Sequence, residues 1–298
     1  MFSEFRKETF GDKVFDIIVW IFILAAVIVC VYPFLYVLSV SISDPTAVQR
    51  GEVVLLPVGF DTTIFGVVMG YQDLWTAYAN TVFYVIVGTT LNIIMTCLAA
   101  YPLSRHSFFL RRKLNFMLAF TMYFSGGLIP TYMVVTGLGL YNSRLAMILP
   151  VLVSAYNVMI CRSAFESLSE ELFENASLEG ANDFIILTKI AVPLIKPTLA
   201  VLTLYYAVAR YNDFFNGLLY ISDKSKQPLQ MFLRRILLQA STEILQGGMS
   251  DSALTAAAQS TLQIRYVCVV LAAIPILCIC PFVQKHLVTG TMLGAVKG

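Results

Sequence analysis

The chain has 298 residues, of which 58% are hydrophobic and only 13% charged, with a formal net charge of +2 and a mean hydropathy of +0.77. A soluble core could not bury so much apolar surface behind so few charges, because soluble domains carry about 25% charged residues. The small net charge also excludes the concentrated basic face of a nucleic-acid-binding protein. These values predict an all-α, polytopic membrane protein with lipid as its second solvent.

Six apolar stretches are long enough to cross a bilayer, whose hydrocarbon core of ~30 Å takes about 20 helical residues. The first is too long for a cleavable signal peptide, so we assign a polar N-terminal segment to residues 1–13 and one transmembrane domain to 14–298. The third stretch contains two glycines and Pro130, which predict a kink. The six predicted spans are 14–42, 77–101, 114–136, 143–165, 196–221 and 264–288.

Lysine and arginine in the short loops predict the orientation, because cytoplasmic loops carry an excess of both. Their densest cluster lies at 105–113, which places both termini in the cytoplasm. The outer side then has two longer loops, 43–76 and 222–263, and the inner side has one long loop, 166–197. Trp75, at the outer boundary, is typical of the aromatic belt at a membrane surface.

The sequence contains none of the usual patterns for catalysis or metal binding. It has no glycine-rich phosphate loop ending in Lys-Ser or Lys-Thr, no metal-ligand spacing and no paired nucleophile and base. Its six cysteines lie in or beside apolar runs and are interpreted as small buried hydrophobic residues. We therefore expect no enzyme activity, no metal and no cofactor in this chain, so that active transport would need a separate source of energy.

Two other classes of membrane protein remain open from the residues alone. A secondary carrier or channel would work without an ATPase and would show inverted repeats and helices broken at the midplane. A membrane-bound enzyme would show a catalytic cluster near one interface. The sequence shows neither feature.

The inner loop 166–197 has the residues of two short helices separated by a glycine turn. Ser169 is a predicted N-cap followed by two glutamates, which suit the positive end of a helix dipole. Gly180 can end the first helix by adopting a positive φ, and a second helix is predicted at 182–191. Pro197 fits the first turn of the next span. An interfacial helix with a solvated acidic face explains the same pattern equally well.

This loop resembles the EAA loop of the permease subunits of bacterial ABC importers. The resemblance lies in Glu174-Asn175-Ala176, in Gly180-Ala181 after three intervening residues, and in the Ile190–Pro193 ending. Asn175 replaces the usual alanine, and Glu179 replaces the aspartate of many sugar permeases. The segments 123–150, 211–237 and 281–298 are similar to the maltose-type carbohydrate permeases, in particular to the subgroup for uronate-containing glycans such as alginate.

The resemblance implies the type I ABC-importer permease fold in the cytoplasmic (inner) membrane of a bacterium. Its implied partners are a second homologous permease, two ATPase subunits that bind ATP and Mg²⁺, and a soluble substrate-binding protein. The cargo would be oligosaccharides, including acidic ones, or alternatively a neutral disaccharide or glycerol phosphate. The loop would be a coupling helix that docks on an ATPase, with Ala176 small because it faces that partner. The implied coupling residues are Glu174, Ala176, Glu179, Gly180, Ala181 and Pro193.

Ionisable residues in the fifth span mark a candidate translocation path, because charges inside a membrane are costly and usually face a cavity or a partner. Arg210 and Asp213 are three residues apart and could form an ion pair along one helix face. This pair could lock helices together, or it could line a path for sugar; an arginine without a paired acid would suit a carboxylated sugar. The candidate path residues are Tyr206, Arg210, Asn212, Asp213 and Asn216.

Two further groups of polar residues have assigned roles. Amides and hydroxyls of the second span, such as Asn80, Thr81, Asn92 and Thr96, are expected to join helices. In the outer loop, the resemblance implies contact with the binding protein. A solvated loop with an amphipathic interfacial helix at 229–245 is compatible with that role. The predicted contact residues are Lys224, Lys226, Arg234 and Arg235.

Overall fold

The computed structural model describes residues 10–245, 263–275 and 277. Within these residues every named secondary-structure element is a helix, so the all-α prediction is confirmed. The chain divides into two compact units, one of 1–70 with 236–271 and one of 71–235 with 272–298. The two units are described in turn.

The first unit begins with α1 (Phe10–Ser41), an apolar helix whose membrane-length stretch buries none of its residues within the chain. Such a helix presents its side chains to lipid or to another protein. A small core forms where α1 ends, around Val40, Ala47 and Val53. Buried Gln263 donates a hydrogen bond from Nε2 to the Ser43 carbonyl oxygen at 2.6 Å. The other helices here are α2 (Pro45–Gln49), α3 (Thr63–Met69) and the start of an apolar helix at Gln263–Pro275.

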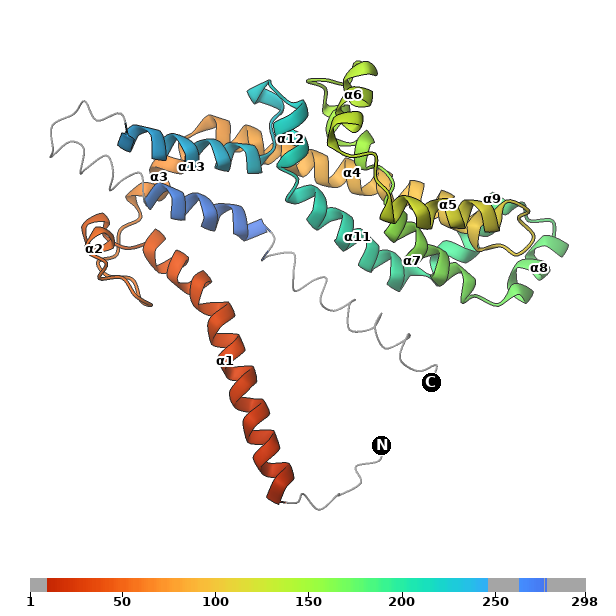
Figure 1. The fold of residues 1–298 in the computed structure, drawn as a ribbon, viewed down its shortest axis with the longest axis horizontal. Coiled ribbons are helices and arrows are strands. Elements are labelled where there is room, and N and C mark those ends of the chain that lie inside the picture. The colour runs from red at the N-terminus through yellow and green to blue at the C-terminus, as the bar shows by residue number, and fades with distance from the viewer. Residues whose placement is uncertain (1–9, 246–262, 276, 278–298) are drawn as a thin grey trace. The chain divides into compact units, whose positions relative to one another are not determined.

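The second unit is built on α4 (Gln72–Ser104), against which α7 (Ala155–Glu166) and α11 (Lys196–Tyr211) pack (Figure 1). Small residues allow this approach: Ala100, Cys161 and Ala191 are fully buried in one apolar cluster. Small side chains at such contacts let helix backbones come close, which is how helices associate in lipid. α4 starts at Gln72, so the predicted loop 43–76 is shorter than expected.

The third and fourth predicted spans are bent. α5 (Arg111–Tyr123) and α6 (Leu128–Gly137) meet at 114°, and Gly127 between them has a φ of 83°. The predicted kink is therefore confirmed: α5 ends at Tyr123, and Gly127, at the N-cap of α6, has a positive φ that suits glycine. The fourth span consists of two 3₁₀ turns, η1 (Arg144–Met147) and η2 (Leu149–Val151), followed at 53° by α7.

The region of the fifth predicted span is also interrupted. The segment Asp183–Leu194 turns by 85° into α11, and Pro197 lies in the first turn of α11 as predicted. After Tyr211 the helix breaks. The following elements are α12 (Phe215–Tyr220), η4 (Lys224–Lys226) and α13 (Leu229–Leu245), and α13 has the predicted bounds.

Two helices among the described residues are long and apolar enough to cross a membrane, or up to five if each bent pair counts as one span. These five match the first five predicted spans. The sixth, 264–288, is matched by the apolar helix at Gln263–Pro275, and its remaining residues other than 277 lie outside the described ones. The predicted segment 281–298 lies there too.

Candidate functional site

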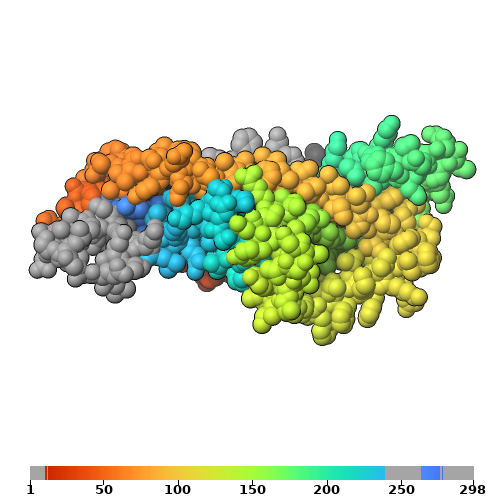
Figure 2. Space-filling view, turned by 90° about the horizontal axis from the view of Figure 1, so that it is seen from above, coloured from red at the N-terminus to blue at the C-terminus, as the bar shows by residue number. Residues whose placement is uncertain are grey.

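The segment between α7 and α11 forms a projection at one end of the second unit (Figures 1 and 2). It contains α8 (Glu170–Leu178), α9 (Asp183–Ile185), the π-helical stretch η3 (Ile186–Ala191) and α10 (Val192–Leu194). We call residues 170–185 the acidic knob. The predicted order of helix, glycine turn and helix is confirmed, since Gly180 has a φ of 86°.

The caps of the acidic knob differ in part from the prediction. Ser169 occupies the N-cap position of α8, but its side chain forms no capping hydrogen bond. The second helix is capped by Asn182, whose Oδ1 accepts a hydrogen bond from the Ile185 amide at 2.9 Å. The Gly180 turn closes with the Ala181 amide donating to the Ala176 carbonyl at 3.0 Å. This 6→1 bond is the kind that ends a helix at a left-handed glycine.

One face of α8 is packed against the rest of its own unit. Phe173 is 3% exposed and Ala176 7%, both within the cluster that also contains Tyr101 and Phe165. The Tyr101 ring lies 5.7 Å from the Phe165 ring and 6.2 Å from that of Phe173. The expectation that Ala176 faces a partner protein is therefore wrong: this residue is small because it faces the core of its own chain.

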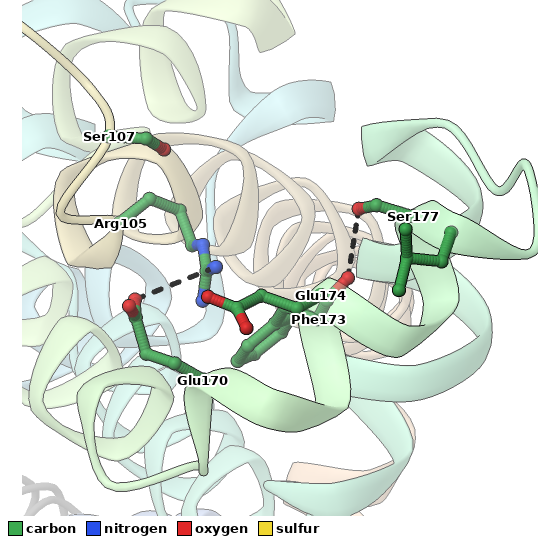
Figure 3. Close-up of a pocket in the computed structure, with 7 residues that line it drawn as sticks. Arg105, Ser107, Glu170, Phe173, Glu174 and Ser177 are labelled. Carbon is green, nitrogen blue, oxygen red and sulfur yellow. Dashed lines mark hydrogen bonds and ion pairs between the residues drawn. The ribbon is translucent and has the colours of Figure 1, made fainter.

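A groove of about 520 Å³ lies between α8 and residues 105–107, which follow α4 (Figure 3). Arg105 directly follows α4, and its side chain reaches across the groove to α8. Its Cζ lies 3.8 Å from the centroid of the Phe173 ring, and its Nη2 lies 3.6 Å from Glu170 Oε1. These contacts tie the end of a membrane-length helix to the acidic knob. The sequence analysis missed this role, although the dense basic cluster at 105–113 indicated its location.

The opposite face of the acidic knob is open to solvent. Glu171, Glu174 and Glu179 are exposed, and none of them forms an ion pair within the described part of the chain. Leu178 is 86% exposed and Phe184 65%. Carboxylates beside large exposed apolar side chains suit a protein partner with a basic rim around an apolar pocket. Of the other predicted coupling residues, Ala181 packs on the core and Pro193 is exposed in α10.

Gly180→Val is expected to destabilise the acidic knob by about 1–2 kcal/mol. A Cβ at this position meets no atom within 4 Å, so the cost comes from the positive φ rather than from a clash. Gly180→Asn is the matched control, because asparagine enters the left-handed region more easily. Amide hydrogen exchange across residues 176–182 measures the effect. Equal protection in the valine and asparagine variants would contradict this explanation.

A second feature is a polar cavity of about 320 Å³ where the fifth span breaks. Four of the predicted path residues line it: Tyr206, Arg210, Asp213 and Asn216. The fifth, Asn212, is exposed and lies outside its lining; its Nδ2 donates to the Val208 carbonyl. The other lining residues are Val151, Ser154, Asn157, Tyr205 and Ala209.

Arg210 is 4% exposed and is held by hydrogen bonds rather than by an acid. Its Nε and Nη2 donate to Asn92 Oδ1 at 3.1 and 2.9 Å. The other acceptors are backbone carbonyls: Nη2 donates to Ile148 at 3.0 Å and Val151 at 3.3 Å, and Nη1 donates to Met147.

The predicted ion pair between Arg210 and Asp213 is not formed. Asp213 instead accepts hydrogen bonds from Asn216, at 3.2 Å from the backbone amide and 2.8 Å from Nδ2. The pairing rule for residues three apart holds within a continuous helix, and α11 ends at Tyr211, before Asp213. Arg210 does join elements of the fold, but through Asn92 and backbone carbonyls.

The predicted binding-protein contact residues are partly engaged within the chain. Lys226 Nζ donates to the Asn142 carbonyl at 3.0 Å, and Arg235 Nη2 lies 2.9 Å from Asp73 Oδ2. Lys224 is exposed and Arg234 is half-buried. Beside them, the pKa of the Asp223 carboxyl lies below its usual value. The larger cause is the hydrogen bond from the Ser225 side chain, and the next is the hydrogen bond from the Ser225 backbone amide.

Polar residues of α4 fasten this segment, as predicted for the second span. Asn80 Nδ2 donates to the Ser225 carbonyl at 2.7 Å, and the Leu229 amide donates to Thr81 Oγ1 at 2.8 Å. Farther along α4, Asn92 bonds to Arg210, and Thr96 Oγ1 lies 2.7 Å from the Tyr206 hydroxyl. One helix thus contacts the acidic knob, the segment 223–229 and two residues that line the polar cavity, Tyr206 and Arg210.

Comparisons with known proteins agree with this arrangement. The chain is 35% identical over 287 residues to the polygalacturonan/rhamnogalacturonan transport system permease protein YtcP of Bacillus subtilis, covering 96% of this chain and 99% of that protein. It is 33% identical to protein LplC of the same organism, covering 98% and 97%. No family model matches the chain.

A solved structure shares the fold. It is the crystal structure of a bacterial ABC transporter involved in the import of the acidic polysaccharide alginate. One of its chains superposes with a TM-score of 0.84 at 34% identity, covering 93% of this chain and 98% of that one.

Bent apolar helices, a buried polar cavity and a projecting acidic knob define a multi-pass membrane transport subunit. The extent and identity of the matches assign it further: the chain belongs to the carbohydrate-transport permeases of ABC importers. It is therefore a transport subunit rather than an enzyme, and the secondary-carrier alternative is excluded.

Proposed function

We propose that this permease imports oligosaccharides into a bacterial cytoplasm as one half of a membrane channel. A second homologous permease would complete the channel, two ATPase subunits would bind ATP and Mg²⁺, and a soluble protein would deliver the cargo. Both termini would face the cytoplasm. The observation that carries the proposal is the acidic knob, whose outer face is free and whose inner face is tied to α4 through Arg105 and Phe173.

The acidic knob would dock on an ATPase subunit. Glu174 is placed for this role because it is exposed at the edge of the groove that Arg105 bridges (Figure 3). Glu179, Gly180 and Ala181 form the turn that sets the direction of α9, and exposed Pro193 lies nearer to α11. A push on α8 would move α4 as well, because packed helices move as rigid bodies.

Cargo would pass the polar cavity beside α11. Asp213 and Asn216 supply a carboxylate and an amide on its wall, which are groups that bind sugar hydroxyls, while the Tyr206 hydroxyl is hydrogen-bonded to Thr96. The binding protein would contact the segment around exposed Lys224 and half-buried Arg234, while Lys226 and Arg235 brace that segment from within. The cargoes named for the relatives, polygalacturonan or rhamnogalacturonan and the acidic polysaccharide alginate, support polysaccharide fragments as cargo.

Reconstitution tests the function. The complete complex, with both permeases, the ATPases and the binding protein, is placed in lipid vesicles with labelled oligogalacturonides. We expect accumulation that requires ATP and Mg²⁺ and stops when the ATPase subunits are left out. Uptake by the permeases without the ATPases would overturn the proposal, and so would a failure of the chain to co-purify with them.

A further inference from the structure

The polar cavity contains one basic residue, Arg210, whose guanidinium nitrogens are already bonded within the chain. All three guanidinium nitrogens of Arg210 donate to Asn92 or to backbone carbonyls of residues 147–151. Gly88 leaves the room that this packing needs, since a Cβ there would lie 2.9 Å from Arg210 Nε. Arg210 therefore builds the wall of the cavity and has no guanidinium nitrogen left unbonded for a sugar carboxylate.

Two other side chains of the lining have unused hydrogen-bonding capacity. Asn157 is 6% exposed, and within the described residues its side-chain amide forms no hydrogen bond; only its backbone amide does, to Ser154 Oγ at 3.4 Å. A side-chain amide that lines a cavity and has no partner can donate to and accept from a bound polar molecule. Asp213 accepts hydrogen bonds only from Asn216 among the described residues, although a carboxylate has about four acceptor sites.

The remaining wall suits a sugar ring. Tyr205 lines the cavity with its side chain 45% exposed, so its ring can stack on the apolar face of a pyranose. The volume of about 320 Å³ lies at the lower end of the range of about 300–1,000 Å³ for small-molecule sites. The cavity is thus of a size for one sugar residue rather than for a length of chain.

We propose that this cavity binds a single uncharged, hydroxyl-bearing sugar residue and that Asp213 excludes a sugar carboxylate from it. Asp213 and the Asn157 amide bind hydroxyls, while the negative charge of Asp213 repels a sugar carboxylate. Arg210 does not pair with that carboxylate, because its nitrogens are bonded to Asn92 and to backbone carbonyls. This proposal rests on the proposed function and specifies which kind of sugar residue the polar cavity binds. It reverses the expectation that Arg210 favours an acidic sugar. The acidic groups of a uronate chain would then be recognised outside this cavity.

The first test uses the complete reconstituted complex and two glycans of equal length, an oligogalacturonide and its carboxyl-reduced, neutral counterpart. Asp213→Asn is expected to lower the ratio of neutral to acidic uptake about tenfold relative to wild type, because asparagine does not repel a sugar carboxylate. Any preference of the binding protein cancels in this comparison. Asn212→Asp, a charge change at the exposed neighbour outside the cavity, should leave the ratio unchanged.

A second test reads binding directly and needs no change at Asp213. In Tyr205→Trp, galactose should quench the new fluorescence of the purified complex at concentrations at least about tenfold lower than galacturonate does. Equal quenching by both sugars, or by neither, overturns the inference, as does an unchanged uptake ratio in Asp213→Asn. These outcomes differ from a failure of the proposed function, in which the wild-type complex would move neither glycan with ATP.

Discussion

Replacing Arg210 by methionine is expected to lower the free energy of unfolding by about 3–5 kcal/mol. Methionine fills much of the space of the arginine stem but provides no donor. It would leave Asn92 Oδ1 and the Met147 and Ile148 carbonyls without their arginine donor, whereas the Val151 carbonyl keeps the hydrogen bond from Asn92 Nδ2 at 2.8 Å. Buried polar groups that lose their partners pay their full desolvation cost, which makes this loss larger than that of an average hydrogen bond. Thermal unfolding of the purified protein in detergent measures it.

Two companion variants separate the hydrogen-bond network from a simple loss of charge. Arg210→Lys keeps the charge but not the planar fork, so it should recover only part of the stability. The double variant Arg210→Met with Asn92→Leu should lose less free energy of unfolding than the sum of the two single losses. Leucine removes the Asn92 Oδ1 acceptor that Arg210→Met would leave without a donor. A melting temperature of Arg210→Met equal to that of wild type would show that these bonds do not hold the second unit together.

The elements were predictable wherever a local rule decides the structure. Apolar length located five of the spans, and the glycine pair before Pro130 located the sharpest bend. The positive φ of Gly180 followed from its place after a helical stretch. The bounds of α13 followed from its amphipathic pattern.

The contacts of the site were not predictable in this way, because they join residues far apart in sequence. Arg210 bonds to carbonyls some 60 positions earlier, which are free only because residues 144–151 form 3₁₀ turns rather than a continuous helix. The predicted pair with Asp213 assumed that α11 continues past Tyr211. The end of α11 at Tyr211 could not be predicted from a local sequence pattern, because tertiary packing determines it.

The two errors at the acidic knob share one cause. Arg105 was interpreted only as part of the charge bias that orients the chain, yet it lies over the Phe173 ring at 3.8 Å. Ala176 was assigned to a partner surface, yet it faces the core of its own unit. The sequence shows which residues a helix carries but not which of its faces the protein itself covers. Here the buried face of α8 leaves the glutamates as the surface available to a partner.

Glu174→Lys is expected to reduce ATP-driven uptake at least about tenfold while leaving the chain folded and inserted. Glu174 is exposed and forms no ion pair among the described residues, so no described ion pair of the permease depends on its charge. Reversing the charge at a docking contact with a basic partner replaces attraction by repulsion, and close interfacial charge pairs are coupled by about 1.5–7 kcal/mol. Uptake and ATP hydrolysis are measured together in the reconstituted complex.

Glu171→Lys is the matched control, because it makes the same charge change on the same helix at an exposed residue outside the groove that Arg105 bridges. If the groove edge is the docking contact, both variants should keep basal ATP hydrolysis. Only Glu174→Lys should lose the stimulation of this hydrolysis by loaded binding protein. Equal losses in both variants would mean that the total charge of the acidic knob matters and not this position. Full uptake in Glu174→Lys would show that this residue has no coupling role. Another contact would then have to transmit the movement of the ATPase to α8 and Arg105.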